Sequence, residues 1–180
     1  MRTRFYELCW FFLLGYFTYS LMEILFRGYT HWTMAVTGGI TAAALYLLHR
    51  SAPAHTLLLQ CLCGALLITA IEFSVGVIDN LVMGWSVWDY SAMPFNLDGY
   101  VCLQYSLLWG LLGMAAVRWG NDLLFRLCAH LPPLLFHAVV WVGMALAVLD
   151  QISAMVVVSR YANRHPRLEQ LNRELGRGSE

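Results

Sequence analysis

The chain has 180 residues, of which 59% are hydrophobic and 12% are charged, and its formal net charge is zero. So small a charged fraction excludes an ordinary soluble domain, and a mean hydropathy of +0.60 agrees with this exclusion. The eleven basic residues are all arginines and are balanced by eleven acidic ones, which argues against a nucleic-acid partner. The composition instead predicts a protein of the lipid bilayer.

Five apolar stretches approach the roughly 20 residues that a helix needs to cross a bilayer. They cover residues 5–26, 32–48, 56–82, 100–117 and 131–158. We therefore predict an all-α, polytopic transmembrane helix bundle of about five spans, with four to six compatible with the sequence. Such a chain would be a multi-pass protein of the cell membrane. The second stretch is the shortest, and its TGGITAAA core indicates either a tight helix or a partly inserted one.

The predicted domains are a helical bundle at residues 1–159, with a polar loop at 83–99, and an Arg-rich polar tail at 160–180. In the tail, Leu168, Leu171 and Leu175 form one apolar stripe after Pro166. This spacing predicts a short amphipathic helix, although an ordinary solvated segment fits the same pattern.

Small residues recur four positions apart inside the apolar stretches. The pairs are Gly38 with Ala42, Gly39 with Ala43, and Gly143 with Ala147. Because such pairs allow helix backbones to approach closely in lipid, they predict helix packing and indicate no function beyond it.

The cysteines and short motifs give no sign of a cofactor. Cys61 and Cys63 are two positions apart in a helical stretch and would point to different faces, so we predict no metal site. The sequence contains neither HExxH nor GxSxG, and it has no phosphate-binding Gly-x4-Gly-Lys motif because it has no lysine. We therefore predict a protein that is not an enzyme and holds no cofactor, while paired carboxylates leave acid–base chemistry open as an alternative.

Carboxylates within apolar stretches are the main candidate site residues, since each costs about 2.5–3.5 kcal/mol to insert into a bilayer. Glu7, near the start of its stretch, fits a boundary residue better, which leaves Glu23, Glu72, Asp79 and Asp150 as candidates. Glu23 precedes Arg27 by four residues, so either an ion pair along one helix face or a role in a site fits it. Asp150 has no basic residue nearby in the sequence. We predict that these four residues line a polar pathway or binding site.

Glu72 is the carboxylate most in need of a partner, because it lies well inside the third stretch with no basic residue within a turn or two. Asp79 follows seven residues later and would lie on the same helix face, about 10 Å away. Gly76 lies between them on that face and would let another helix come near. A satisfied polar bridge between helices remains the alternative to a functional role for Glu72.

The polar loop carries the second set of candidate residues. Trp88 and Tyr90 are typical of the headgroup level of a membrane. The Asp-Tyr-Ser and Pro-Phe-Asn sequences predict turns in which side chains bond their own backbone. We expect a compact loop folded back beside Glu72 and Asp79, with a gating or structural role. Its candidate residues are Trp88, Asp89, Tyr90, Ser91, Pro94, Asn96 and Gly99.

These residues also carry a resemblance to a known family. The sequence IEFSVG at 71–76, followed by WDYSAMPFNLDGYVCLQYSLLWGLL at 88–112, resembles the ABC-transporter type IV membrane proteins, a CmpB-like family. YSLMEILFRG at 19–28 and AVLDQISAMV at 147–156 are similar to its first-helix Glu and last-helix Asp segments. One loop departs from the family, since RGYTHWTMAVTGG replaces its usual Gly-Pro-rich sequence.

The resemblance implies a permease-like membrane subunit for a small solute. Any ATP hydrolysis would come from a separate ATPase subunit, and a homo-oligomer is expected because five spans make a small pathway. The alternative is a non-transporting scaffold or regulatory protein, in which the buried charges only hold helices together.

Overall fold

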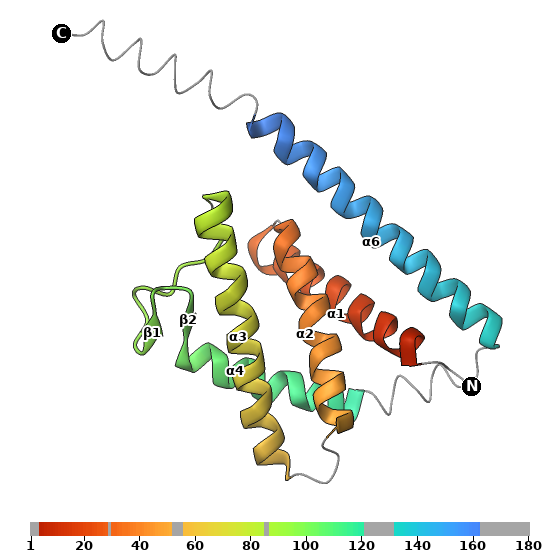
Figure 1. Ribbon diagram of the computed structural model, residues 1–180, viewed down its shortest axis with the longest axis horizontal. Coiled ribbons are helices and arrows are strands. Elements are labelled where there is room, and N and C mark those ends of the chain that lie inside the picture. Colours follow the sequence, from red (N-terminus) through yellow and green to blue (C-terminus); the bar gives the residue numbers. More distant parts are fainter. Residues whose placement is uncertain (1–3, 29, 52–55, 85–86, 121–131, 163–180) are drawn as a thin grey trace, which may run out of the picture. The chain divides into compact units, whose positions relative to one another are not determined.

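The computed structural model describes residues 4–28, 30–51, 56–84, 87–120 and 132–162. Most of them are helical: α1 (Arg4–Arg27), α2 (Trp32–Ser51), α3 (Leu57–Met83), α4 (Leu103–Ala115) and α6 (Pro133–Ala162) (Figure 1). A π-helical turn, η1 (Ala116–Gly120), continues α4, and two short strands, β1 (Asn96–Leu97) and β2 (Val101–Cys102), precede it. The predicted all-α class is confirmed.

Three of the helices are long and apolar enough to cross a bilayer, namely Arg4–Phe26 of α1, Leu57–Leu81 of α3 and Pro133–Val157 of α6. Helix α4 has only 13 residues, which corresponds to about 20 Å at the rise of an α-helix and is shorter than the hydrocarbon core. Length and apolarity thus support three of the five expected spans. For the segments of α2 and α4, membrane crossing stays a prediction.

The fourth helix begins three residues later than the apolar stretch that predicted it. Val101 and Cys102 pair with Leu97 and Asn96 in an antiparallel ladder, and the Leu103 N–H donates to the carbonyl of Phe95 at 3.2 Å. An apolar run does not by itself distinguish a short buried strand from a helix. The helical reading of residues 100–102 was therefore wrong.

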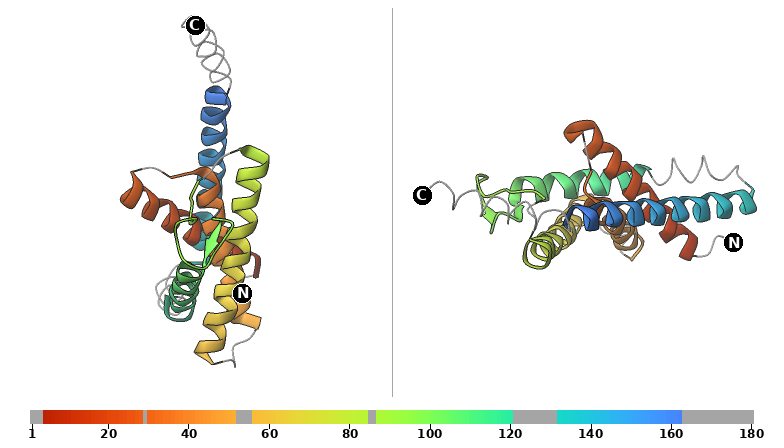
Figure 2. Two further views of the ribbon diagram at one scale, coloured as in Figure 1. Left: turned by 90° about the vertical axis from the view of Figure 1, so that its left-hand side faces the viewer. Right: turned by 90° about the horizontal axis from the view of Figure 1, so that it is seen from above.

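The chain divides into two compact units, Met1–Gly143 and Met144–Glu180, with the boundary inside α6. In the first unit, α1 packs along α2, α3 packs along α4, and α2 contacts α3. Figures 1 and 2 show the loop with β1 and β2 at the start of α4, beside α3.

The described part of the second unit is the end of α6, residues 144–162, with apolar side chains such as Leu146 and Leu149 exposed. The predicted tail helix and the basic part of the tail fall on residues 163–180, which lie outside the described residues. The division into residues 1–159 and 160–180 therefore stays a prediction.

Glycines bring α1 and α2 into close contact. A Cβ on Gly15 would overlap the carbonyl oxygen of Gly38 and lie 2.6 Å from the Cβ of Ala42. A Cβ on Gly39 would lie 2.6 Å from the ring of Phe12. The predicted close approach of helices at the small residues of α2 is confirmed.

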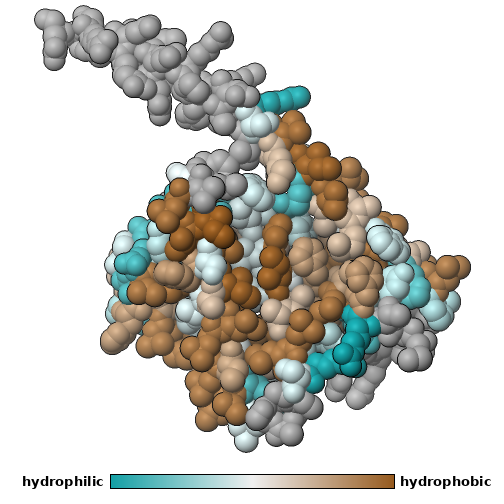
Figure 3. All heavy atoms as spheres, viewed as in Figure 1, coloured by the Kyte–Doolittle hydropathy of each residue, from teal (hydrophilic) through white to brown (hydrophobic). Residues whose placement is uncertain are grey.

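The outer faces of the helices are strongly apolar. Leu25 and Phe26 of α1 and Leu58, Leu66 and Leu81 of α3 are all more than 70% exposed. Figure 3 shows apolar residues over much of the face in view. Apolar surface of this extent favours contact with lipid over contact with water.

Candidate functional site

Glu72 lies on the inner face of α3, and its side chain is only 8% exposed. Its Oε2 atom is buried and has no hydrogen-bond partner among the described residues. Helix α3 is apolar on both sides of this position, with the sequence ITAIEFSVG at residues 68–76, so the helix carries the carboxylate into an apolar interior. A buried carboxylate oxygen without a donor is costly, and it therefore marks a place where a ligand, a proton or water would be bound.

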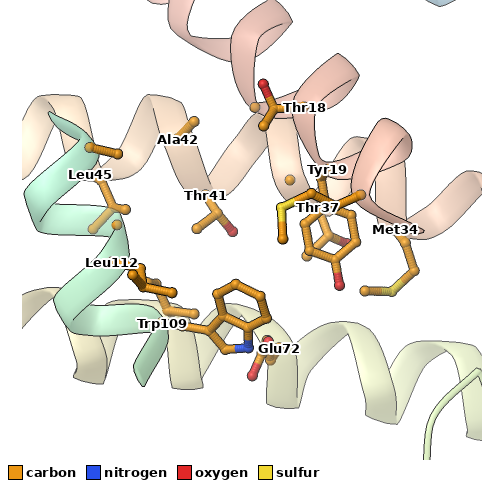
Figure 4. A pocket seen from close by; sticks show the side chains of 16 residues that line it. Thr18, Tyr19, Met34, Thr37, Thr41, Ala42, Leu45, Glu72, Trp109 and Leu112 are labelled. Carbon is orange, nitrogen blue, oxygen red and sulfur yellow. The ribbon is translucent and has the colours of Figure 1, made fainter. Parts of the chain in front are cut away.

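Two cavities meet at Glu72. The smaller, of about 230 Å³, extends between α1, α2, α3 and α4, and its apolar wall includes Leu45, Ile68 and Leu112. Figure 4 shows the Glu72 carboxylate reaching this cavity from α3, with Trp109 of α4 beside it and Tyr19 of α1 and Thr37 of α2 across it.

The larger cavity has a volume of about 510 Å³ and extends from Glu72 toward the polar loop. It shares five residues with the smaller cavity: Tyr19, Met22, Met34, Glu72 and Trp109. Glu23 and Phe26 of α1 and Trp88 and Tyr90 of the loop line it as well. Two of the predicted carboxylates and two of the predicted loop residues thus border one space.

Glu23 and Asp79 differ from Glu72 because both are buried with hydrogen-bond donors. The Thr30 hydroxyl donates to Glu23 Oε2 at 2.8 Å, and the backbone N–H of His31 donates to the same oxygen at 3.3 Å. The Thr33 hydroxyl donates to Asp79 Oδ2 at 2.9 Å. The expected pairing of Glu23 with Arg27 concerns a side chain that lies outside the described residues.

His31 connects the two carboxylates into one network. Its Nδ1 lies 2.6 Å from the Thr33 hydroxyl. Since that hydroxyl has one hydrogen and gives it to Asp79, Nδ1 must carry the proton and donate to Thr33. Burial lowers the pKa of His31, while the nearby carboxylates of Asp79 and Glu23 act to raise it. The lowered pKa favours the neutral imidazole ring, so we take His31 as the neutral Nδ1–H tautomer.

The polar loop is held by its own side chains. Asp89 Oδ1 accepts from the Ser91 N–H at 2.8 Å, which holds the pKa of Asp89 below its usual value. The Asn96 amide donates to the carbonyls of Met93 and Ser91, and its oxygen accepts from the Gly99 N–H at 3.2 Å. The predicted turn chemistry, in which side chains bond their own backbone, is confirmed.

Backbone geometry completes this loop. Phe95, Asp98 and Gly99 adopt positive φ angles of 54°, 52° and 74°. Gly99 sits against Asp89, because a Cβ on Gly99 would lie 2.9 Å from Asp89 Oδ1. Pro94 is exposed and makes the turn without lining either cavity.

The loop packs on α3 at Gly76, between Glu72 and Asp79. A Cβ on Gly76 would lie 2.9 Å from the Tyr100 ring and 3.3 Å from the Trp88 ring. The Trp88 indole N–H donates to the Tyr100 carbonyl at 2.7 Å, which fixes the Trp88 ring in this position. The sequence suggested that a helix would approach Gly76; the neighbour is instead the loop itself.

Asp150 is exposed on α6 and belongs to the second unit, whereas Glu23, Glu72 and Asp79 belong to the first. Its backbone carbonyl accepts from the Ser153 hydroxyl at 2.8 Å. Its place in a shared pathway stays a prediction.

Sequence reasoning missed the network residues Thr30, His31 and Thr33. Their signal was the run of polar residues directly after the first apolar stretch, in the loop that departs from the family's usual sequence. It also missed Tyr105 and Trp109, which line the cavities from α4 and cannot be told from lipid-facing aromatics without the packing.

Apolar helices long enough to cross a bilayer, with buried carboxylates around internal cavities, define an α-helical membrane protein. The family described as "Putative ABC-transporter type IV" matches residues 8–155, and the chain belongs to that family. The resemblance found in the sequence is thereby confirmed. No curated protein and no solved structure matches the chain.

Proposed function

We propose that the chain is a permease-like subunit that binds and moves a small solute through the two cavities beside Glu72, as a multi-pass protein of the cell membrane. The observation that carries this proposal is the Oε2 atom of Glu72, which is buried at the junction of the cavities without a hydrogen-bond partner among the described residues.

The neighbouring carboxylates provide an internal comparison. A carboxylate that serves only to hold helices together is expected to have donors, as Asp79 has from Thr33 and Glu23 from Thr30. Glu72 is as buried as Glu23, yet its Oε2 has no hydrogen-bond partner among the described residues. Glu72 is therefore the strongest candidate for a solute-binding group, with Glu23 next because it borders the larger cavity.

The loop at residues 88–99 would act as the gate of the pathway. Trp88 and Tyr90 form part of the wall of the larger cavity, while the remaining loop residues hold the backbone in shape. Movement of the loop away from Gly76 would open that wall. Asp150 and a second copy of the chain would complete the pathway in the assembled transporter.

Energy for transport would come from another chain. The sequence has no lysine and hence no phosphate-binding Gly-x4-Gly-Lys motif, so a separate ATPase subunit would supply ATP hydrolysis.

A scaffold or regulatory role is the second candidate, and the Glu23 and Asp79 hydrogen bonds favour it. Under that reading all three carboxylates serve helix association and no solute is moved. Glu72→Gln separates the two functions, because it removes the charge and keeps the shape.

The test uses cells that make either the wild-type chain or Glu72→Gln together with the other subunits of the complex. Intracellular solutes are profiled by mass spectrometry, and assembly is measured by size-exclusion chromatography in mild detergent. We expect Glu72→Gln to assemble normally and to lose the solute change that the wild type produces. Asp98→Asn is the matched control, because it removes an exposed carboxylate that lines neither cavity. Lost assembly with an unchanged solute profile would contradict the permease and support the scaffold.

A further inference from the structure

The larger cavity has an unusual combination of aromatic and acidic walls. Five aromatic residues with a polar edge line it: Tyr19, Trp88, Tyr90, Tyr105 and Trp109. Glu23 and Glu72 are the charged residues of the lining, and no basic residue belongs to the described lining. The solute that fits such a cavity would therefore carry positive charge.

Three of these aromatic rings are held in place by contacts within the protein. Tyr90 of the loop stacks on Tyr105 of α4 with ring centroids 5.1 Å apart and an interplanar angle of 27°. Trp88 is fixed by its hydrogen bond to the Tyr100 carbonyl. Rings fixed before binding lose little conformational entropy when a ligand arrives, so their contacts contribute more fully to affinity.

The chemistry of the cavity wall limits the chemical class of the ligand. Aromatic faces carry negative electrostatic potential and attract a cation that lies over the ring. The carboxylate of Glu72 adds a countercharge in an apolar surrounding. An anion would be repelled by both carboxylates. A small hard cation such as Mg²⁺ prefers a shell of oxygen ligands, whereas this wall is mostly ring carbon and thioether.

We propose that the cavity binds an organic cation, meaning a quaternary or protonated amine, with its ammonium group beside Glu72 and the aromatic rings. Apolar substituents of the amine would extend past Trp109 into the smaller cavity, whose wall includes Leu45, Ile68 and Leu112. This inference names the solute class of the proposed permease and rests on that function for transport, but the binding itself is testable alone.

The test compares choline with 3,3-dimethylbutan-1-ol, an uncharged molecule of the same shape in which carbon replaces nitrogen. Binding to the purified full chain is measured by isothermal titration calorimetry in maltoside micelles, which carry no ammonium group. We expect choline to bind at least about tenfold more tightly than the alcohol, since tenfold corresponds to about 1.4 kcal/mol. Equal binding of both molecules, or binding of neither, would overturn the inference. This comparison needs no variant and so does not depend on how well a variant folds.

Two substitutions locate the site. Glu72→Gln is expected to weaken choline binding about tenfold or more, whereas Asp98→Asn should leave it unchanged. Tyr105→Leu removes one ring of the stacked pair and is expected to weaken choline while leaving the alcohol unaffected. An unchanged choline affinity in both Glu72→Gln and Tyr105→Leu would place the cation elsewhere and overturn the inference.

A lipid headgroup offers the same ammonium chemistry as a free amine. Dihexanoylphosphatidylcholine, titrated below its micelle concentration, distinguishes the two sources. Binding at or below the affinity of choline supports a free amine, whereas much tighter binding that is lost in Glu72→Gln assigns the same site to a lipid headgroup. In both cases the cation site is supported.

The outcome also separates this inference from the proposed function. If choline and the alcohol bind equally but Glu72→Gln still loses the solute change in cells, the permease stands and the cationic solute class is wrong. If choline binds through Glu72 but the solute profile is unaffected by Glu72→Gln, the cation site stands and transport fails.

Discussion

The Thr33 hydroxyl joins α2 to α3 within the buried network, because it donates a hydrogen bond to Asp79 Oδ2 at 2.9 Å. Thr33→Val keeps the shape of the side chain and removes the hydroxyl, leaving Asp79 Oδ2 without this donor. Because a bond to a charged group contributes about 1.5–3 kcal/mol, we expect a loss of stability of that order. The measurement is thermal unfolding of the purified chain in detergent.

Thr69→Val is the matched control for this prediction. The Thr69 hydroxyl bonds only the Ala65 carbonyl in its own helix, at 2.7 Å, so its loss should cost much less. Equal unfolding temperatures for Thr33→Val and Thr69→Val would show that the network between α2 and α3 contributes nothing particular.

His31 predicts a pH dependence. Burial lowers its pKa below the ordinary value of 6.5, against the opposing carboxylates of Asp79 and Glu23. A histidine with a lowered pKa contributes stability that is complete above pH 6.5 and is lost as pH falls through the folded-state pKa. We expect the wild type to lose stability on acidification in this range more steeply than His31→Asn, whose amide nitrogen can still donate to Thr33. Identical pH profiles of the two proteins, from thermal unfolding between pH 8 and pH 5, would contradict this account.

At the scale of the helix pair, the contact of α1 with α2 depends on Gly15. Gly15→Ala would force a Cβ onto the backbone of Gly38, which cannot move unless the helices separate. Overpacking of this kind costs about 1–3 kcal/mol. We expect a correspondingly lower unfolding temperature in detergent.

The control at this scale is Gly143→Ala. A Cβ there meets the terminal Cδ1 of Leu13, a flexible group that can turn aside. Since alanine is the better helix former by about 1 kcal/mol, this variant should be neutral or slightly more stable. Equal destabilisation by both alanines would show that the α1–α2 contact has no special role.

The conformation of the polar loop depends on the hydrogen bonds of the Asn96 side chain. Asn96→Ala removes the donors to Met93 and Ser91 and the acceptor of the Gly99 N–H. We expect amide hydrogen exchange at Gly99 to become at least about tenfold faster, which corresponds to a local loss of about 1.4 kcal/mol. Asp98→Asn keeps a residue that tolerates the φ of 52° and should leave this exchange unchanged. Unaltered exchange in Asn96→Ala would show that the backbone alone holds the loop.

For the whole molecule, apolar runs predicted the helices closely because a membrane helix is set mainly by composition and length. The turn residues of the loop were also predictable, since Asp89 and Asn96 act on their own backbone. The network from Glu23 to Asp79 was not, because it depends on how the chain turns back at Thr30 toward Glu23 and on the packing that brings Thr33 of α2 to Asp79 of α3. The role of Gly15 was also not predicted. The residues four positions to either side of it, Phe11 and Tyr19, are large, so no pair of small residues four apart marks this position.

The cavity itself also depends on packing. Glu72 could be singled out by its position in an apolar run. Only the structure shows that Asp79 and Glu23 have donors, while the buried Glu72 Oε2 has no hydrogen-bond partner among the described residues. The sequence therefore predicted all these carboxylates as one set of candidates, and only the packing shows which of them have hydrogen-bond donors.

We propose above that this chain is the membrane subunit of a transporter whose ATPase is a separate chain. The most direct measurement is ATP hydrolysis by the complex that copurifies with the full chain from mild detergent, compared between wild type and Glu72→Gln. The account predicts no hydrolysis by the chain alone, hydrolysis by the complex that rises with solute, and loss of that rise in Glu72→Gln with the complex intact. Hydrolysis by the isolated chain, or a solute response that Glu72→Gln leaves unchanged, would contradict it.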